Sequence, residues 1–213
     1  MVTASIDIPE FSYPGSQHIV LHNIRMALVS GAAILLHGDN ASGKSSLGKL
    51  LCGLLRPRLG QVLVDGSEVW RLRGSNRLRL AYYLGQEYSL SFYHATIAGE
   101  LSHAMRLGGK KNIQLPSMSD FSLPDLDTTP LDLGSCAAWR LSLLCATLVR
   151  PRVLFIDEVP SLGSAAVVDF LRQTMQQRTR SGGVTVVSYQ RPISLKNAFT
   201  QEFHLVDGEV FER

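Results

Sequence analysis

The segment HGDNASGKSS, residues 37–46, constrains the fold more than any other feature because it fits the pattern G-x-x-x-x-G-K-[ST]. A glycine-rich turn lets successive backbone N–H groups surround an anion, and the helix that follows points its positive end at that anion. Lys44 would reach the outer phosphates of a nucleotide, and the Ser45 hydroxyl could ligate the accompanying Mg²⁺. The predicted phosphate-binding residues are Gly38, Asp39, Asn40, Ala41, Ser42, Gly43, Lys44, Ser45 and Ser46.

The two flanks of this loop have the character that the motif requires. The segment AAILLHG before it, residues 32–38, is a short apolar run typical of a buried strand. The segment SSLGKLLCGLL after it, residues 45–55, carries apolar residues at helical spacing. A surface turn rich in glycine and serine would explain neither flank. The sequence therefore predicts strand, phosphate loop and helix in that order.

Length and composition indicate an ordinary globular protein. The chain has 213 residues, enough for one large core or for one core with a small lobe attached. Apolar residues make up 45% and charged residues 18%. The net charge of +3 is too small and too scattered to indicate a nucleic-acid partner. The basic cluster WRLRGSNRLRL, residues 70–80, is predicted to be a solvated helix or turn.

The cysteines and the hydropathy pattern favour a cytoplasmic protein. Cys52, Cys136 and Cys145 lack the spacing of a metal site, so we expect reduced thiols. The sequence contains no signal peptide and no apolar run approaching 18 residues. If the protein acts at a membrane, we expect another polypeptide to supply the spans.

The pattern of elements along the chain indicates an α/β fold. Helical and apolar-strand segments alternate after the phosphate loop, which predicts a mostly parallel sheet covered on both faces. Strands near both ends, including a hairpin that turns at Asp207-Gly208, predict antiparallel pairing beside it. Residues 87–132 change character, with one helical segment and a run rich in Gly, Lys, Pro and Ser. We expect one domain over residues 1–213, with a core of 1–86 and 137–213 and an inserted helical lobe at about 87–136.

A second motif, RVLFIDEV at residues 152–159, ends a buried strand with two carboxylates. The first carboxylate of such a pair, Asp157, can hold Mg²⁺, usually through water. The second, Glu158, can orient or deprotonate an attacking water. Alone such a pair means little, but together with the phosphate loop it predicts a nucleotide-hydrolysing site.

With both motifs, the chain resembles the nucleotide-binding subunits of ATP-binding cassette (ABC) transporters from about residue 7 to residue 213. The resemblance implies a P-loop NTPase fold with a RecA-like sheet, and it implies ATP and Mg²⁺ as cofactors. The segment FSYPGS is similar to the segment that stacks on adenine, which places Tyr13 against the base. Gln86 falls at the glutamine that senses Mg²⁺ and contacts the membrane partner. Asp157 matches the Mg²⁺-binding aspartate and Glu158 the catalytic glutamate.

Within the family, the chain is most similar to the ATPases of energy-coupling-factor importers. The segment QEYSLSFYHATIAGEL, residues 86–101, aligns without gaps to the pattern Q-x-P-x-x-Q-x-x-x-x-T-V-x-x-D/E of that branch. The segments FSYPG and GLLRPRLGQVLVDG are also similar to it. Tyr88 stands in place of the proline of the pattern and Ser91 in place of its second glutamine.

Three departures from the family pattern bear on activity. The slot of the L-S-G-G-Q signature, which faces the partner's ATP in the head-to-tail dimer, contains Leu133-Gly134-Ser135-Cys136-Ala137. The family's glycines keep side chains away from the γ-phosphate, so the side chains of Ser135 and Cys136 predict an impaired half-site. Tyr189 replaces the switch histidine that contacts the γ-phosphate, and Ser164 replaces an aspartate that couples the two sites.

The resemblance therefore implies an ATPase of weak or partner-dependent activity, with Glu158, Gln86 and Lys44 as the catalytic residues. A second, intact ABC ATPase subunit in a heterodimer is preferred over a homodimer. The other implied partner is a membrane-spanning transporter subunit, docked near residues 86–96, with Tyr88, Phe92 and Tyr93 as candidate contacts or as residues packed inside the lobe. This arrangement places the protein at the inner face of the cell membrane.

Two other functions remain open at this point. The first is an ATP-binding regulatory or scaffold module with little hydrolysis of its own, which the altered signature and Tyr189 motivate. The second is a small P-loop kinase. Residues 87–132 argue against a kinase, because Arg106 is the only arginine there that could clamp a transferred phosphate.

Overall fold

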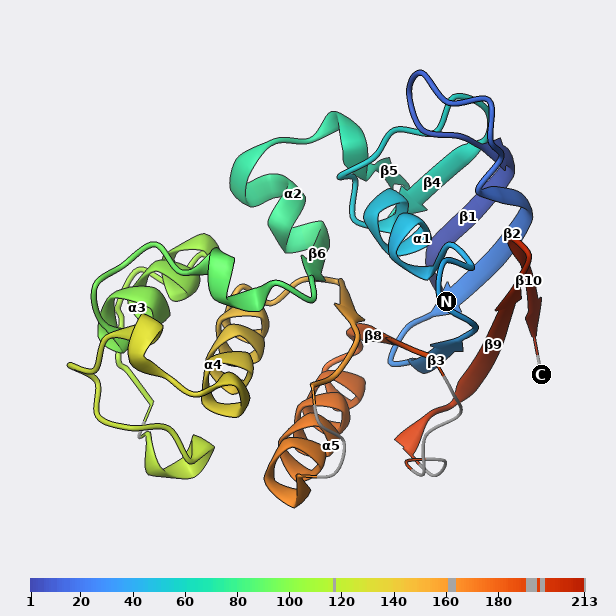
Figure 1. The fold of residues 1–213 in the computed structure, drawn as a ribbon. Helices are drawn as coiled ribbons and strands as arrows, with labels where there is room; N and C mark the ends of the chain where they lie inside the picture. The colour runs from blue at the N-terminus through green and yellow to red at the C-terminus, as the bar shows by residue number, and fades with distance from the viewer. Residues whose placement is uncertain (117, 161–163, 191–194, 196–197, 213) are drawn as a thin grey trace.

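A six-stranded sheet forms the centre of the protein in a computed structural model that describes residues 1–116, 118–160, 164–190, 195 and 198–212 (Figure 1). Its strand order is β10-β9-β3-β8-β7-β6, and every neighbouring pair is parallel except β10 with β9. The expected mostly parallel α/β sheet is therefore confirmed. The strands are β3 (Ala33–His37), β6 (Ala81–Leu84), β7 (Val153–Asp157), β8 (Val184–Tyr189), β9 (Gln201–Val206) and β10 (Glu209–Glu212).

The parallel strands bring both sequence motifs to one edge of this sheet. Strand β3 ends at His37, directly before the phosphate loop, and β7 ends at Asp157, directly before Glu158. Strand β8 lies between them, pairing with β3 on one side and with β7 on the other. In open α/β sheets, ligands bind at the carboxyl ends of the strands.

A smaller antiparallel sheet covers one face of the central sheet. Its order is β2-β1-β4-β5, with Ile6 opposite Met26 and Val62. The expected antiparallel strands near the N-terminus are therefore present. Their bounds are β1 (Val2–Phe11), β2 (Leu21–Val29), β4 (Gln61–Val64) and β5 (Ser67–Glu68).

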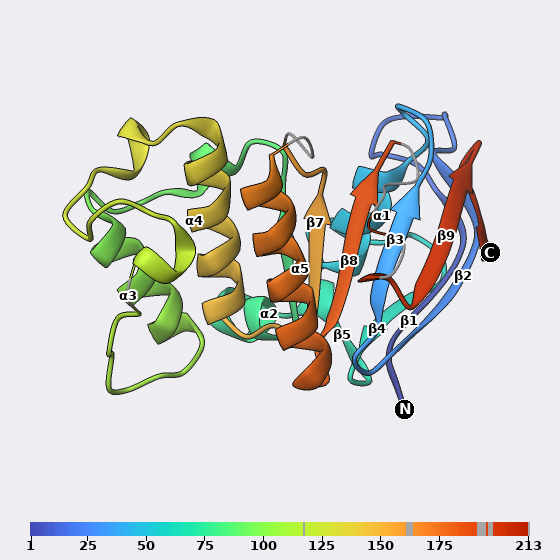
Figure 2. The ribbon, with the colours of Figure 1, turned by 90° about the horizontal axis from the view of Figure 1, so that it is seen from below.

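The helices lie on both faces of the central sheet. Helix α1 (Lys44–Leu51) lies between the two sheets, against β4, β6 and β7, whereas α4 (Ser135–Leu148) and α5 (Ala165–Arg180) cover the opposite face (Figure 2). Alternate strand residues face opposite sides. Accordingly, Ile34 and Leu36 pack with α1 and the antiparallel sheet, while Ala33 and Leu35 pack with α4 and α5.

The segment between β6 and β7 forms the helical part of the molecule. Helix α3 (Ile97–Leu107) packs on α4. Thr96 caps its N-terminus, since the Thr96 side chain accepts the N–H of Gly99. The apolar residues of α3, α4 and α5 join one buried cluster with the sheet. The boundary of the inserted lobe at 136/137 stays a prediction. Within the described part of this segment lie the short 3₁₀ helices η2 (Tyr88–Ser91), η3 (Ser119–Phe121) and η4 (Pro130–Asp132), and η1 (Val69–Arg71) follows β5.

Two further expectations concern the surface and the cysteines. The basic cluster forms η1 and α2 (Gly74–Leu80), and α2 contains no buried residue, as expected for a solvated face. Cys52, Cys136 and Cys145 are free thiols. No helix within the described ranges is long and apolar enough to cross a membrane.

Candidate functional site

The phosphate loop is shaped by glycines that no other residue could replace without movement. Gly43 precedes α1 with φ of 106°, in the left-handed region that favours glycine, and a Cβ there would lie 2.6 Å from Leu21. A Cβ on Gly38 would lie 2.2 Å from the carbonyl oxygen of Leu205. Both clashes show that the loop is held tightly against its neighbours, in the strand–loop–helix arrangement that the sequence predicts.

Lys44 lies at the loop, and the residue as a whole is only 6% exposed. Its Nζ donates to the carbonyl oxygens of Gly38 and Asp39, each at 2.7 Å. Burial lowers the pKa of Lys44, and the negative charges of Glu158, Asp157 and Asp39 oppose that effect. The lysine is therefore fixed at the loop and presents a cation to the space that the loop encloses.

One buried hydroxyl in the loop has no hydrogen-bond partner among the described residues. The Oγ of Ser42 is among the few buried side-chain polar atoms of the described residues without a hydrogen bond. Such an atom costs free energy unless a ligand or water satisfies it. Together with the glycines and Lys44, it fits an anion such as a nucleotide phosphate.

A cavity of about 390 Å³ opens beside the loop and collects several of the predicted site residues. It brings Gln86 and Glu158, which are distant in the sequence, next to Lys44 and Ser45. Gln190 also lines the cavity, although it was not predicted from the sequence. It is a polar residue directly after β8, and its position at the carboxyl end of a parallel strand could have indicated a site residue. The cavity is lined by Val20, Asn40, Ala41, Gly43, Lys44, Ser45, Ser46, Gln86, Glu158 and Gln190.

Two residues at this cavity have strained backbones. Glu158 has φ of 65° and Ala41 has φ of 62°, although neither is glycine. A non-glycine residue in the left-handed region costs on the order of 1–3 kcal/mol and is enriched at functional sites. The N–H of Glu158 is held by the Ser188 hydroxyl at 3.3 Å. This backbone brings Glu158 to the wall of the cavity, where a carboxylate could accept a proton from water.

Asp157 is 2% exposed, and hydroxyl groups occupy both of its carboxylate oxygens. Ser188 donates to Oδ1 at 2.6 Å, and Tyr83 donates to Oδ2 at 2.5 Å. Burial raises the pKa of the Tyr83 hydroxyl, and its hydrogen bond to Asp157 raises it further. A carboxylate so enclosed suits contact with Mg²⁺ through water, and its donors fix its orientation.

The two other aromatic candidates have different environments. Tyr13 lies at the loop, since its hydroxyl is 2.8 Å from the Oγ of Ser46 and its ring meets Phe11 edge to face. Tyr189 packs against the core cluster of α4 and α5 and does not line the cavity. Its carbonyl accepts the N–H of Gly38 at 3.3 Å. The structure therefore brings the backbone of Tyr189, rather than its ring, to the phosphate loop.

The signature slot lies at the start of α4. Gly134 precedes the helix, and a Cβ there would meet nothing within 4 Å. Ser135 is exposed as the first residue of α4, and Cys136 packs against the core cluster of α4 and α5. Of the SLGS segment, residues 161–163 lie outside the described residues, and Ser164 directly precedes α5.

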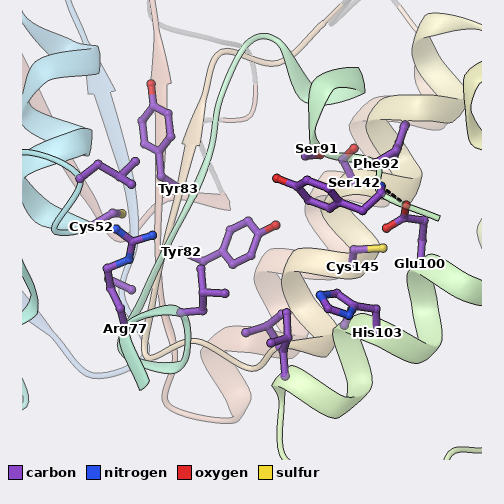
Figure 3. A pocket seen from close by; sticks show the side chains of 17 residues that line it. Cys52, Arg77, Tyr82, Tyr83, Ser91, Phe92, Glu100, His103, Ser142 and Cys145 are labelled. Carbon is purple, nitrogen blue, oxygen red and sulfur yellow. Dashed lines mark hydrogen bonds between the residues drawn. The ribbon is translucent and has the colours of Figure 1, made fainter. Parts of the chain in front are cut away.

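A second cavity, of about 340 Å³, lies between β6, α2, α3 and α4 and is called the lobe cavity below (Figure 3). Phe92 and Tyr93, two of the candidate docking residues, line it, whereas Tyr88 packs in the core of the helical part. Buried Glu100 accepts the backbone N–H groups of Tyr93 and His94 and so fixes this segment. Its wall includes Arg77, Tyr82, Phe92, Tyr93, Glu100 and His103.

Comparisons with known proteins agree with this geometry. The sequence profile described as ABC transporter matches residues 21–161. The energy-coupling factor transporter ATP-binding protein EcfA1 of Lactiplantibacillus plantarum is 26% identical, over 100% of this chain and 79% of its own length. EcfA1 of Geobacillus kaustophilus is 24% identical, over 86% of this chain and 68% of its own length.

Solved structures agree on the fold. An ATP-binding subunit of an ABC transporter has a TM-score of 0.82 at 20% identity, covering 100% of this chain and 90% of its own. The dimeric cassette MJ0796 bound to ADP and Pi has a TM-score of 0.78 at 18% identity, covering 99% and 97%. The resemblance found in the sequence is thereby confirmed, and the chain belongs to the ABC transporter family as one of its ATP-binding subunits.

Proposed function

We propose that this chain binds Mg·ATP at the phosphate loop and hydrolyses it in a head-to-tail pair with a second cassette. The observation that carries the proposal is the cavity that brings Lys44, Ser45, Gln86 and Glu158 together. In it, Lys44 and the loop amides would hold the phosphates. Ser45, Gln86 and, through water, Asp157 would hold Mg²⁺, which supplies charge neutralisation when bound. Tyr13 would lie against the base, beside Ser46.

Glu158 has the position of a general base in this proposal. Its carboxylate lines the cavity, and its strained backbone is held by Ser188. A positioned carboxylate that accepts a proton from the attacking water contributes on the order of 10²–10⁴-fold to such reactions. Gln190 would supply a neutral amide at the same cavity.

The second cassette in the pair is a different protein in this proposal. The side chains of Ser135 and Cys136 occupy the slot where the family has glycines. A partner with an intact signature would complete this chain's own ATP site. The partner's site would face the altered slot, which supports an unequal pair over a homodimer.

The lobe cavity is where a membrane-spanning partner would dock. Tyr93 is 80% exposed at its rim, and Phe92 lines it beside Tyr82. An exposed aromatic next to a partly apolar cavity is typical of a protein interface. One solved relative, CbiO1 of Clostridium perfringens, is described as part of the transporter complex CbiONQ, and an assembly of that kind is proposed for this chain.

A pull-down of the tagged chain from detergent-solubilised membranes of its own organism tests the proposal. We expect a polytopic membrane protein and a second cassette with an intact signature to copurify, and the complex to hydrolyse ATP. Tyr93→Ala should reduce recovery of the membrane protein without reducing ATP binding. Recovery of the chain alone, or with soluble proteins only, would contradict the transporter assignment and favour the scaffold module.

A further inference from the structure

Two neighbouring tyrosines on β6 point to opposite sides of the strand. Figure 3 shows the ring of Tyr82 directed into the lobe cavity and the ring of Tyr83 directed away from Tyr82. This follows from the alternation of side chains along a strand. The Tyr83 ring stacks beside Phe155 of β7, with ring centroids 5.7 Å apart, which holds its hydroxyl near the end of β7.

The Tyr83 hydroxyl contacts Asp157, one of the residues that the proposed function assigns to Mg²⁺. It donates to Asp157 Oδ2 at 2.5 Å. Because Asp157 is buried and accepts this hydrogen bond, the Tyr83 hydroxyl fixes the direction of that carboxylate oxygen.

Both carboxylate oxygens of Asp157 are held by hydroxyl groups. Tyr83 donates to Oδ2, and Ser188 donates to Oδ1 at 2.6 Å. A carboxylate that contacts a cation, directly or through water, must keep an oxygen lone pair turned toward it. Outer contacts of this kind orient metal ligands and tune their affinity.

We propose that Tyr83 is a positioning residue for Mg²⁺, which orients Asp157 through its hydroxyl. This inference rests on the proposed Mg·ATP site. It concerns metal affinity and not the phosphate contacts, since the loop amides and Lys44 hold the phosphates without Tyr83. Loss of the Tyr83 hydroxyl leaves Asp157 Oδ2 without its donor, so that the carboxylate can turn away from the metal.

The test compares Tyr83→Phe with Tyr82→Phe in the full chain. Phenylalanine at 83 keeps the ring that stacks on Phe155 and removes only the hydroxyl, while Tyr82→Phe removes a hydroxyl from the other side of the same strand. Binding of a fluorescent ATP analogue is titrated with Mg²⁺, and separately measured in EDTA. We expect Tyr83→Phe to raise the Mg²⁺ concentration at half-saturation about 5- to 30-fold, from a lost hydrogen bond to a charged group.

The Mg²⁺ titration and the measurement in EDTA together distinguish a loss of metal affinity from a general loss of structure. Affinity for the analogue in EDTA should stay within about twofold for both variants, and Tyr82→Phe should leave the Mg²⁺ requirement unchanged. An unchanged Mg²⁺ requirement in Tyr83→Phe overturns the proposal, as does an equal loss of affinity in EDTA. If Tyr83→Phe does not fold, Tyr83→Met, which also lacks the hydroxyl, is measured in the same way. Failure of the unmodified chain to bind nucleotide at all would instead overturn the proposed function.

Discussion

The phosphate loop and the signature slot are the two surfaces of this chain that would meet ATP, and they differ in how their backbone amides are left exposed. At the loop, glycines at 38 and 43 allow close approach, and a partnerless Ser42 hydroxyl lies within it. At the slot, Ser135 adds an exposed side chain at the first position of α4, and Cys136 packs against the core cluster of α4 and α5. A ligand would thus meet glycine-flanked backbone donors at the first surface and side chains in their place at the second.

This difference shows how one subunit can contribute to two ATP sites that differ in how well they can contact the nucleotide. The loop depends on residues of α1, β6 and β7 that the core fixes, whereas the slot depends on the few residues that start α4. Substitution at the start of one helix alters the slot and leaves the core intact. The four predictions below test the two surfaces, from the largest expected effect to the smallest.

Glu158→Gln should lower the rate of ATP hydrolysis about 10²- to 10⁴-fold, because the amide cannot accept a proton from water. The affinity for ATP should stay within about twofold, since the variant keeps the side-chain shape. Steady-state phosphate release and equilibrium binding measure the two quantities. Glu10→Gln, an exposed carboxylate on β1, is the matched control. Unchanged turnover in Glu158→Gln would remove Glu158 from the catalytic role.

Lys44→Ala should weaken ATP binding about 10- to 100-fold, the effect of losing one charged hydrogen bond at 1.5–3 kcal/mol. The neutral side chain also leaves the carbonyls of Gly38 and Asp39 without their donor. Isothermal titration with ATP measures the loss, and Lys111→Ala on the exposed surface is the control. Equal affinities for both variants would show that ATP binds elsewhere.

Cys136 should react with iodoacetamide about tenfold faster than Cys52 or Cys145 at neutral pH. Burial raises the pKa of the Cys52 and Cys145 thiols and so lowers their thiolate fractions, whereas Cys136 lies half-buried at the start of α4. Mass spectrometry after timed labelling gives the three rates. Addition of ATP and the second cassette should then protect Cys136, because the slot would be covered. An unchanged rate of Cys136 labelling in the presence of ATP and the second cassette would argue against a head-to-tail pair.

Ala41→Gly should raise the free energy of unfolding by about 0.5–1 kcal/mol, since Ala41 has φ of 62° and glycine adopts that conformation without strain. In a chain of this size the midpoint of thermal unfolding should rise by about 1–4 °C. The reverse control is Gly66→Ala, at φ of 75°, which should lower the midpoint although nothing surrounds the added methyl group. A fall in the midpoint of Ala41→Gly would contradict the strain at this position.

Features encoded by neighbouring residues were predictable from the sequence. The loop between β3 and α1 follows from its glycines and its apolar flanks, and the hairpin of β9 and β10 turns at Asp207-Gly208 as expected. Both residues of that turn have positive φ, of 48° and 83°, which Asp-Gly tolerates well. Such features depend on local conformation, which a short stretch of sequence determines.

Features that depend on the pairing of distant strands were not predictable. The contact of Tyr83 with Asp157 requires β6 to lie beside β7 in the register that places Tyr83 opposite Phe155. Likewise, Gln190 lines the cavity whereas Tyr189 packs against the core cluster of α4 and α5. The sequence alone does not determine which of these two neighbouring side chains reaches the cavity. A motif alignment assigns a position but not the direction of its side chain.

The four-residue strand β6 joins two regions of the molecule. It forms the edge of the central sheet, where it pairs with β7. Tyr82 on one side faces the lobe cavity, and Tyr83 on the other touches Asp157. Strand β6 therefore places a residue of the lobe cavity and a hydrogen-bond donor to Asp157 at adjacent positions. A step of one residue along one edge strand separates the two regions.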